Sequence, residues 1–396
     1  MNILHISQIL PIPGIKNDNN FVFTLASHLR EQFPTVSSYF LRPIPYTNRI
    51  LGKFQKTSTF IPKGFQGYKY DNYDVMTLIF FSAWSQNNLH ALLSNSAYWL
   101  NREIIEELIY QKDISVIHAQ QIFPDGLIAL LIKKKFNIPY IITTHQELRY
   151  FNNFLSKRVA ISILQNASKV TPLNYRNYNF FKSLRINNIN LLPLGFDSAF
   201  LKKAEDNRAG SNIFKIISIC ELIQLKNIDK VLNALCVLKN SHNIKYTVIG
   251  VGPEMGVLKD LSFKLGVEDY VDFIGYVDNK VIPDILQKHD LFVLPSFPET
   301  FGRVYFEAMA SGLPVICAKN SGIYGYYPDL VDKYSVQPEN SEELINNINY
   351  FIENKTQRLE IGKKLQSLVS TYTWENIAKA YKKLYAEAAV CEQNNC

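Results

Sequence analysis

The sequence predicts an α/β fold with two doubly wound parallel-sheet domains. Short apolar strands alternate with amphipathic helices through both halves of the chain, as in parallel sheets covered by helices. A polar, glycine-containing stretch at residues 202–212 interrupts this alternation and marks a domain boundary. A chain of 396 residues is too long for one ordinary domain and comfortable for two. We therefore expect domains at residues 1–198 and 199–372, followed by a terminal helical segment at residues 373–396.

The first half is expected to form a sheet with histidines at the ends of two strands. Its strands are predicted at residues 2–6, 74–84, 114–118, 139–145 and 190–192, and its helices at 21–32, 92–110, 124–135 and within a further βα unit at 168–181. His118 and His145 end two of these strands. Since ligands of open α/β sheets bind beyond the carboxyl ends of the strands, both histidines are candidates for a site. A structural role is the commoner alternative for a lone histidine.

Two loops of the first half carry further signals. Gly14 is the only glycine in the polar loop after the first strand, and its spacing alone indicates a simple turn. Residues 46–70 contain interleaved aromatic rings, no acid, and five basic residues between positions 49 and 69. Such a segment can rest on an anionic membrane, where each basic residue contributes roughly 1 kcal/mol. A solvated connecting loop with some rings folded inward is an equally good interpretation.

The second half repeats the alternation of strands and helices. Its strands are predicted at residues 214–220, 245–250, 271–275, 290–295 and 314–318, and its helices at about 228–239, 254–265 and 280–288. Three amphipathic helical segments follow from Ser341, the last running from Thr373 to about Ala388. Each half therefore predicts its own parallel sheet.

Residues 290–315 carry the most specific signal in the chain. They predict a buried strand at 291–294, a loop, and a short helix at 304–311. Glu299 lies on the loop and Glu307 lies about one turn into the helix. Unpaired amides and the helix dipole favour an anion at the helix N-terminus between them. A phosphate between two carboxylates that can hold hydroxyls suits a nucleotide-sugar.

Composition and charge restrict the classes of partner. The formal net charge of +7 and the pI of about 8.9 fit a phosphate-bearing small molecule or an anionic membrane surface. The sequence contains no zinc-finger pattern, RRM motif or dense basic stripe, so we expect no nucleic acid as a partner. None of the five cysteines has metal or redox spacing, which favours reduced thiols.

The N-terminus and the hydropathy pattern bear on location. No charged region precedes the first strand, and no apolar run approaches the length of a membrane span. We therefore expect a cytoplasmic protein, or one attached peripherally to the inner face of the cell membrane.

Several motifs, in order along the chain, resemble one known family. The most specific is Glu299-Thr-Phe-Gly-Arg-Val-Tyr-Phe-Glu307 with the Ala-Met-Ala-Ser-Gly-Leu-Pro-Val that follows it. The other motifs are Val116-Ile-His118, Pro193-Leu-Gly-Phe-Asp197, Lys226, Val248-Ile-Gly-Val-Gly-Pro253, Phe273-Ile-Gly-Tyr276 and Tyr372-Thr-Trp374. Over nearly its full length the chain resembles the retaining glycosyltransferases of the GT4 family, also called glycosyl transferases group 1. This resemblance implies the GT-B fold, with two facing Rossmann-like domains, an interdomain cleft, and a terminal helix that packs back on the first domain.

The resemblance also implies roles on the donor side. Glu307 would hold the ribose hydroxyls of a UDP- or GDP-sugar, and Glu299 would lie by the hydroxyls of the donor sugar. Lys226 would neutralise the diphosphate as it leaves, which stabilises the transition state electrostatically. Tyr276 would border the base. The amides that cover the diphosphate would be those of Phe301, Gly302 and Arg303.

From the first domain the resemblance implies three further residues, with Gly14 at the donor, His118 in catalysis and His145 on the acceptor side. Gly14 would let the backbone approach the phosphate or the acceptor, His118 would face the reacting sugar, and His145 is a second candidate. No Asp-x-Asp motif precedes a strand-end loop, so the transfer is expected to need no metal or other cofactor. Retention of anomeric configuration follows from the family. Since no side chain is an obvious nucleophile, a front-face path is favoured over a covalent intermediate.

Some residues depart from the family pattern. Glu221 stands in place of the usual arginine, so half of the positive diphosphate clamp is missing or is supplied elsewhere, for example by Arg303. Leu194 replaces an asparagine. Where many members have Gly-Gly-x-x-Glu, this chain has Ser321-Gly-Ile-Tyr-Gly325, which lacks the glutamate.

Three functions are compatible with this sequence. The leading hypothesis is a glycosyltransferase that acts on a glycan or lipid-linked acceptor in bacterial surface polysaccharide synthesis. The first alternative is a catalytically weak GT-B protein that binds a nucleotide-sugar or a partner, as Glu221 and Gly325 suggest. The second alternative is a nucleotide-sugar isomerase, which the paired-glutamate motif disfavours.

Overall fold

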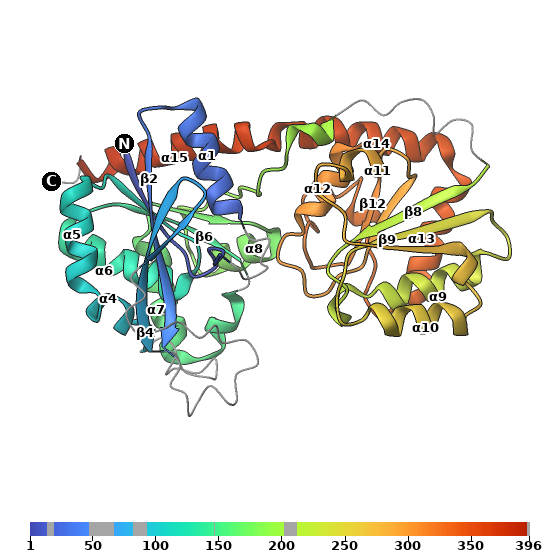
Figure 1. Ribbon diagram of the computed structural model, residues 1–396, viewed down its shortest axis with the longest axis horizontal. Helices are drawn as coiled ribbons and strands as arrows, with labels where there is room; N and C mark the ends of the chain where they lie inside the picture. Colours follow the sequence, from blue (N-terminus) through green and yellow to red (C-terminus); the bar gives the residue numbers. More distant parts are fainter. Residues whose placement is uncertain (14–19, 47–66, 82–92, 146, 202–211, 394–396) are drawn as a thin grey trace. The chain divides into compact units, whose positions relative to one another are not determined.

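The computed structural model describes residues 1–13, 20–46, 67–81, 93–145, 147–201 and 212–393 (Figure 1). They form two compact units. The first comprises Met1–Leu173, Asn177–Leu192 and Ile377–Cys396, and the second comprises Asn174–Arg176 and Pro193–Asn376. The chain thus passes to the second unit at Pro193, a few residues before the predicted boundary, and returns to the first unit within its last helix.

Among the described residues, the first unit has a seven-stranded sheet in the order β3-β4-β2-β1-β5-β6-β7. Its strands are β1 (Asn2–Ile6), β2 (Ser37–Tyr46), β3 (Gly67–Tyr70), β4 (Tyr73–Phe81), β5 (Val116–Ala119), β6 (Tyr140–Thr144) and β7 (Lys169–Pro172). Strand β3 pairs antiparallel with β4, and the other pairings are parallel. This is the predicted parallel sheet with one antiparallel edge strand.

Strand β2 has no counterpart in the sequence-based prediction. It lies near the middle of the sheet and pairs with β1 only as far as Leu41. Pro43 and Pro45 lie beyond that point, where β4 is its partner. Prolines are tolerated in a strand where a missing N–H interrupts no ladder, so they do not prevent pairing here.

Two other predictions for the first unit are corrected. The final four residues of the predicted basic–aromatic loop, 67–70, form β3, while residues 47–66 lie outside the described part of the chain. The strand predicted at 190–192 is replaced by an isolated bridge between Val170 and Ile189. Short edge pairings of this kind carry little hydrophobic periodicity, which is why the sequence does not reveal them.

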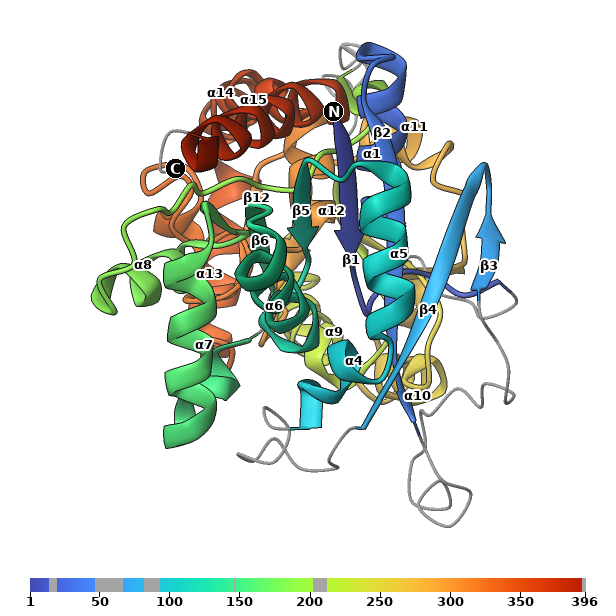
Figure 2. The same cartoon turned by 90° about the vertical axis from the view of Figure 1, so that its left-hand side faces the viewer.

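Helices cover both faces of the first sheet. They are α1 (Phe21–Gln32), α4 (Ser96–Trp99), α5 (Arg102–Lys112), α6 (Leu127–Phe136), α7 (Phe154–Asn166), α8 (Tyr175–Ser183) and the short η1 (Ile122–Gly126) and η2 (Glu147–Asn152). Leu4 and Ile6 pack into a buried cluster with residues of α5, α6 and α7, which lie on the near side of the sheet in Figure 2. His5 points to the opposite face, beside the ring of His118. The helix predicted at 92–110 is split into α4 and α5, and α7 was not predicted.

The second unit contains a five-stranded parallel sheet in its described part, in the order β10-β9-β8-β11-β12. The strands are β8 (Phe214–Ile219), β9 (Ile244–Ile249), β10 (Val271–Gly275), β11 (Leu291–Leu294) and β12 (Val315–Cys317). The chain adds β9 and β10 on one side of β8 and then β11 and β12 on the other. The order therefore reverses between β8 and β11, which is where open α/β sheets bind ligands.

The helices of the second unit follow the predicted positions closely. They are α9 (Ile228–Leu238), α10 (Met255–Lys264), α11 (Ile282–Leu286), α12 (Arg303–Ala310), α13 (Ser341–Glu353), α14 (Lys355–Val369) and the start of α15 (Trp374–Gln393). Two α/β domains with parallel sheets are thus confirmed. No helix of the described segments is long and apolar enough to cross a bilayer.

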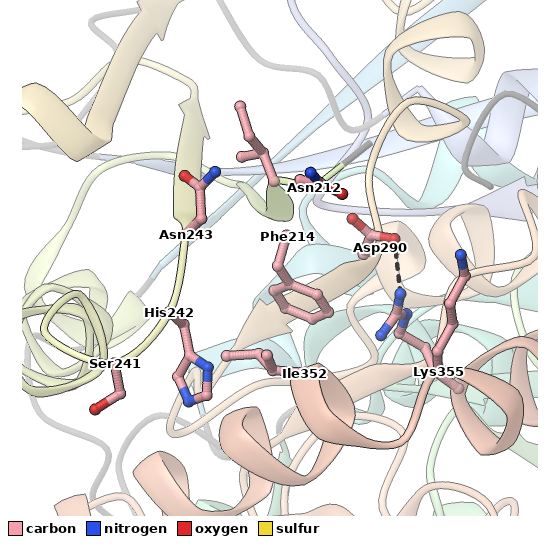
Figure 3. Close-up of a pocket in the computed structure, with 10 residues that line it drawn as sticks. Asn212, Phe214, Ser241, His242, Asn243, Asp290, Ile352 and Lys355 are labelled. Carbon is pink, nitrogen blue, oxygen red and sulfur yellow. Dashed lines mark hydrogen bonds and ion pairs between the residues drawn. The ribbon is translucent and has the colours of Figure 1, made fainter. Parts of the chain in front are cut away.

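A pocket of about 300 Å³ lies at the amino ends of β8 and β11 (Figure 3). Arg358 of α14 lines it and binds the carboxylate of Asp290 at 3.3 Å. The guanidinium of Arg358 also lies over the ring of Phe214, 4.8 Å from its centre. These contacts fasten α14 to the sheet. The pocket is therefore at the opposite end of the strands from the switch point, and the candidate site must be sought elsewhere.

Candidate functional site

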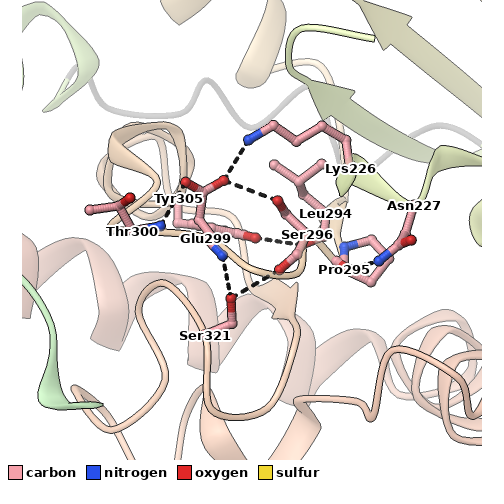
Figure 4. A network of polar contacts seen from close by, with 9 residues as sticks. All are labelled: Lys226, Asn227, Leu294, Pro295, Ser296, Glu299, Thr300, Tyr305 and Ser321. Carbon is pink, nitrogen blue, oxygen red and sulfur yellow. Dashed lines mark hydrogen bonds and ion pairs between the residues drawn. The ribbon is translucent and has the colours of Figure 1, made fainter. Parts of the chain in front are cut away.

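Two side chains of opposite charge meet at the switch point of the second sheet. Lys226 ends the short helical turn η5 (Gln224–Lys226) that follows β8, and Glu299 lies in the loop after β11. Lys226 Nζ donates to Glu299 Oε2 at 2.6 Å (Figure 4). The side chains are 19% and 14% exposed, so this ion pair is largely shielded from solvent but reachable. The structure thus brings together two residues that the sequence predicted for the donor site.

Hydroxyl and amide groups hold the Glu299 side chain from several directions. Ser296 Oγ donates to Glu299 Oε2 at 3.0 Å, and the Thr300 amide donates to Oε1 at 3.0 Å. The backbone of Glu299 is also held, because its amide donates to Ser321 Oγ at 2.7 Å and its carbonyl accepts from the Gly322 amide at 3.1 Å. Ser296 and Ser321 cannot be recognised as site residues in the sequence, since isolated serines carry no distinguishing pattern.

The start of the helix after this loop has the features of an anion-binding helix N-terminus. Gly302 precedes α12 with a φ of 72°, a left-handed conformation that glycine adopts readily. A Cβ at this position would lie 2.5 Å from the ring of Tyr305. Because Gly302 has no side chain to cap α12, amides of the first turn can bind an oxygen anion. The helix runs from Arg303 to Ala310, one residue earlier than the sequence predicted.

Arg303 and Glu307 form the second ion pair of the site. Arg303 Nε donates to Glu307 Oε1 at 3.0 Å, one turn further along α12. Burial raises the pKa of the Glu307 carboxyl, the Arg303 guanidinium opposes this shift, and the carboxylate of Asp197 adds to it. Arg303 therefore favours the ionised form of the Glu307 carboxylate, in addition to any contact with a diphosphate.

The departures from the family pattern now have a structural setting. Glu221 is exposed on the turn after β8. Gly325 has a φ of 98°, and a Cβ there would lie 2.6 Å from the Cβ of Tyr175. Since Tyr175 occupies the space beside Gly325, the backbone at this position leaves no room for a glutamate side chain.

Apolar groups are exposed at the carboxyl ends of β9 and β10. Tyr276 follows β10 with 62% of its surface exposed, and Val251 and Ile274 are exposed on the same edge of the sheet. Exposed side chains of this kind can stack a nucleobase. That Tyr276 borders the base of a donor stays a prediction.

The structure corrects the prediction for His118. Its side chain is fully buried, with Nδ1 2.7 Å from the hydroxyl of Tyr385 and Nε2 2.8 Å from Thr143 Oγ1. Burial lowers the pKa of His118 well below its usual value, and the neighbouring His5 and His145 lower it further. A neutral ring with both nitrogens bonded inside the first unit cannot face a sugar, so His118 is an internal contact between β5 and α15.

The other two predicted residues of the first domain have different outcomes. Gly14 lies outside the described residues. His145 follows β6 at its carboxyl end, its ring lies 5.4 Å from that of Phe21, and its carbonyl accepts from Asn177 Nδ2 at 2.6 Å. Burial lowers the pKa of His145 to about 4, so the ring is neutral at physiological pH. His145 therefore stays a candidate at the strand end.

A polar cluster at the same edge of the first sheet was missed by the sequence analysis. The fully buried carboxylate of Asp125 accepts from the Gln8 amide through both oxygens, at 3.1 and 3.2 Å. Burial lowers the pKa of Arg42, while the neighbouring Tyr68 and Asp125 raise it. Asp125 and Arg42 are far apart in sequence and lie on an irregular helix and a missed strand, so no motif could have linked them.

Comparison with known proteins is consistent with this site. Residues 201–387 match the family model described as glycosyl transferases group 1. A glycosyltransferase of Methanocaldococcus jannaschii is 29% identical over 43% of this chain and 44% of that protein. Alpha-monoglucosyldiacylglycerol synthase of Acholeplasma laidlawii is 23% identical over 71% of this chain and 77% of that protein.

Solved structures extend the likeness to the whole chain. Sucrose-phosphate synthase from Thermosynechococcus elongatus has a TM-score of 0.72 at 16% identity, covering 99% of this chain and 100% of that chain. Anabaena HepE in complex with UDP-glucose has a TM-score of 0.64 at 19% identity, covering 98% and 99%. Residues 201–387 thus carry the signature of the group 1 family, and both units together have the fold of these enzymes. Over residues 201–387 the chain is similar to the group 1 glycosyltransferases, and its two units have the GT-B fold.

Proposed function

We propose that this protein is a retaining glycosyltransferase of the GT4 type that transfers a sugar from a nucleotide-sugar to a hydroxyl of a glycan or lipid-linked acceptor. The observation that carries the proposal is the Lys226–Glu299 ion pair at the switch point of the second sheet. Beside it lie the uncapped start of α12 and the carboxylate of Glu307. This arrangement offers two carboxylates for hydroxyls, and a cation and amides for a diphosphate.

Each group then has a defined task toward the donor. Amides of residues 301–303 bind the diphosphate, and Lys226 neutralises the charge that develops on it as the sugar leaves. Glu299 accepts hydrogen bonds from the sugar hydroxyls, Glu307 accepts them from the ribose, and Tyr276 borders the base. Anabaena HepE, of the same fold, forms complexes with UDP and with UDP-glucose, which supports a UDP-sugar as the donor to try first.

The transfer itself follows a front-face path in this proposal. The bond between the anomeric carbon and the diphosphate oxygen breaks, and the acceptor oxygen bonds to the same face of that carbon. The proton of the acceptor hydroxyl passes to the departing phosphate oxygen. Because Lys226 and the amides stabilise the leaving charge, the step needs no divalent cation, and transfer in excess EDTA at the rate of untreated enzyme is the expected result.

A lipid-linked acceptor at a membrane surface is supported by a patch on the first unit. Ile79, Phe81, Trp99 and Leu100 are exposed apolar residues of β4 and of α4 and its end. The Phe81 amide donates to Ser96 Oγ at 2.8 Å, which brings strand and helix together. Relatives named as synthases of monoglucosyldiacylglycerol and as phosphatidylinositol N-acetylglucosaminyltransferases also support a lipid acceptor. An inner-leaflet location and a role in surface polysaccharide synthesis belong to the same proposal, as does membrane contact through residues 49–69.

The second candidate function is a GT-B protein that binds a nucleotide-sugar with little turnover. Glu221 in place of the usual arginine, and Tyr175 filling the space beside Gly325, favour it. Both features reduce the number of charged groups that contact the donor. Binding alone therefore does not separate the two functions, and turnover must be measured.

The test combines a donor screen with an acceptor extract. UDP-glucose, UDP-galactose, UDP-N-acetylglucosamine and GDP-mannose with labelled sugars are incubated with the protein and with bacterial lipid and glycan extracts. Transfer of label from one donor, with retained configuration, is the expected result, and Glu299→Gln should lower it at least about 100-fold. Tight binding without transfer to any extract would favour the second candidate. Conversion of the donor without acceptor would indicate an isomerase instead.

A further inference from the structure

Glu299 needs support, because the loop that carries it belongs to neither a strand nor a helix. The loop runs from Pro295, after β11, to Gly302, before α12. Asn227 Nδ2 donates to the carbonyl of Pro295 at 2.7 Å and so holds the first residue of the loop. The middle of the loop is held by a second loop, which follows β12 and contains Ser321.

One hydroxyl group ties the two loops together. Ser321 Oγ accepts the amide of Glu299 at 2.7 Å and donates to the carbonyl of Ser296 at 3.1 Å (Figure 4). The hydroxyl therefore accepts one hydrogen bond and donates another. Together the two bonds link Ser296, at the start of the turn, to Glu299. The next residue continues the contact, since the Gly322 amide donates to the carbonyl of Glu299 at 3.1 Å.

Burial makes these bonds matter for the position of the loop. Ser296 is fully buried and Ser321 is 6% exposed, so water cannot readily replace either hydroxyl. A buried amide or carbonyl that loses its partner costs roughly 1–3 kcal/mol. Without the Ser321 hydroxyl, the Glu299 amide and the Ser296 carbonyl would each lose a hydrogen-bond partner. We expect the loop between Ser296 and Glu299 to move so that these groups find new partners.

The carboxylate end of Glu299 is oriented by the same turn. Ser296 Oγ and Lys226 Nζ both contact Oε2, at 3.0 and 2.6 Å, and the Thr300 amide contacts Oε1. Ser296 thus acts on both the backbone and the side chain of Glu299. Its carbonyl binds Ser321, which holds the Glu299 amide, and its hydroxyl binds the Glu299 side chain. With no carboxylate at Gly325, the orientation of Glu299 carries more of the recognition of the donor sugar.

We propose that Ser321, acting with Ser296, is a positioning residue that holds the Glu299 carboxylate at the angle needed for the hydroxyls of the donor sugar. This inference rests on the proposed function of Glu299. It adds that recognition of the sugar part of the donor depends on the loop after β12, whereas recognition of the nucleoside diphosphate does not. Ser321 itself contacts neither the sugar nor the reacting atoms.

Hydrogen exchange tests the positioning without any ligand. The amides of Ser296, Phe297, Glu299 and Thr300 are compared in the parent protein, in Ser321→Ala and in Ser335→Ala. Ser335 is a matched control, since it is equally buried in the second unit and its hydroxyl contacts the Val331 carbonyl and Cys317 Sγ, away from Glu299. Ser321→Ala should exchange at least about tenfold faster at these four amides, with the amides of residues 301–303 and the rest of the unit unchanged, and Ser335→Ala should leave all of them as in the parent.

Calorimetric titration with UDP and with UDP-glucose tests the consequence for the donor. We expect Ser321→Ala to bind UDP as the parent does and to bind UDP-glucose about tenfold more weakly, as loss of one oriented charged hydrogen bond predicts. Unchanged loop exchange in Ser321→Ala would overturn the proposal whatever the ligand result. Faster exchange with equal loss of UDP and UDP-glucose affinity would overturn it too. A parent protein that binds no nucleotide would instead refute the proposed function, and the exchange result would still decide whether Ser321 holds Glu299.

Discussion

The Nδ1 atom of His118 lies 2.7 Å from the hydroxyl of Tyr385, so that strand β5 is joined to the last helix of the chain by a buried hydrogen bond. A second tyrosine strengthens the joint, because the hydroxyl of Tyr381 lies 3.0 Å from Thr143 Oγ1 on β6. Buried polar groups that satisfy one another specify a unique packing arrangement. This network therefore fixes where α15 docks on the sheet of the first unit.

Replacing Tyr385 with phenylalanine should weaken this docking. Tyr385→Phe keeps the ring but leaves His118 Nδ1 without its partner, so we expect the free energy of unfolding to fall by about 1–3 kcal/mol. Urea denaturation followed by circular dichroism measures this change. Tyr110→Phe is the control, since Tyr110 is 73% exposed and should differ from the parent by less than about 0.5 kcal/mol. Equal stability of Tyr385→Phe and the parent would show that the bond does not hold the helix.

Acid should destabilise the first unit through its buried histidines. Burial lowers the pKa of His5 to about 3 and of His145 to about 4, and it lowers that of His118 well below its usual value. The unfolded chain protonates these rings near pH 6.5 while the folded chain keeps them neutral. The unfolded state thus binds more protons below that pH, and stability falls as the pH drops from about 6.5 toward 4.

The change of the free energy of unfolding with pH can be assigned to a particular histidine. Each ring contributes up to about 1.4 kcal/mol per pH unit within its window. Urea midpoints measured from pH 7.5 to 5 should therefore fall steadily in the parent. His5→Asn should flatten that slope by one proton, whatever its effect on stability at pH 7.5. A parent whose stability is constant between pH 7 and 5 would contradict the burial of neutral rings.

Glycine at position 302 is required for the start of α12. In Gly302→Ala the new Cβ meets the ring of Tyr305 at 2.5 Å, and the left-handed backbone adds about 1–2 kcal/mol. We expect lower stability, and at least about tenfold weaker binding of UDP because the amides of the first turn move. Gly256→Ala is the control, since a Cβ there meets nothing within 4 Å. If Gly302→Ala bound UDP like the parent, the helix start would not be the diphosphate site.

Arg303 should determine the pH at which the carboxylate of Glu307, which we propose binds the ribose, becomes available. Burial raises the pKa of Glu307 and the Arg303 guanidinium opposes that rise. Removal of the guanidinium in Arg303→Ala should raise this pKa further, so the carboxylate is lost at a higher pH. We expect the affinity for UDP to fall on acidification in both proteins, with the fall in Arg303→Ala displaced to higher pH.

Titrations between pH 5 and 8 measure this displacement. Lys364→Ala removes an exposed i,i+4 pair with Glu360 and should leave the profile unchanged. Identical pH profiles for the parent and Arg303→Ala would mean that Glu307 does not bind the ribose.

The sequence predicted the second unit well because its signals are local. The strand, loop and helix between residues 290 and 315 form within about one residue of the predicted positions, and Lys226 meets Glu299 there. A buried strand, a helix start and two carboxylates at fixed spacing are all properties of one short segment. The order of parallel strands then brings the loop after β8 beside the loop after β11.

The sequence predicted the first unit less well. The positions of its candidate site residues depend on which strands pair and on which side of the sheet each side chain lies. His118 ends a predicted strand, but the sequence does not show that its ring faces Tyr385 of a helix 267 residues later. Strand β2 contains two prolines. The sheet tolerates them near its middle because the pairing with β1 ends before them. Ser321 holds Glu299 through a tertiary contact that no spacing rule could reveal.

We propose that the Lys226–Glu299 pair marks the binding site for the diphosphate and sugar of a nucleotide-sugar. The most direct measurement is the dissociation constant for UDP-glucose in the parent, Lys226→Met and Lys230→Met. Lys230 is a neighbouring lysine whose side chain is 39% exposed and pairs with Asp229. We expect Lys226→Met to bind UDP-glucose at least about tenfold more weakly and Lys230→Met to bind it like the parent. Equal affinities in all three proteins would contradict this proposal.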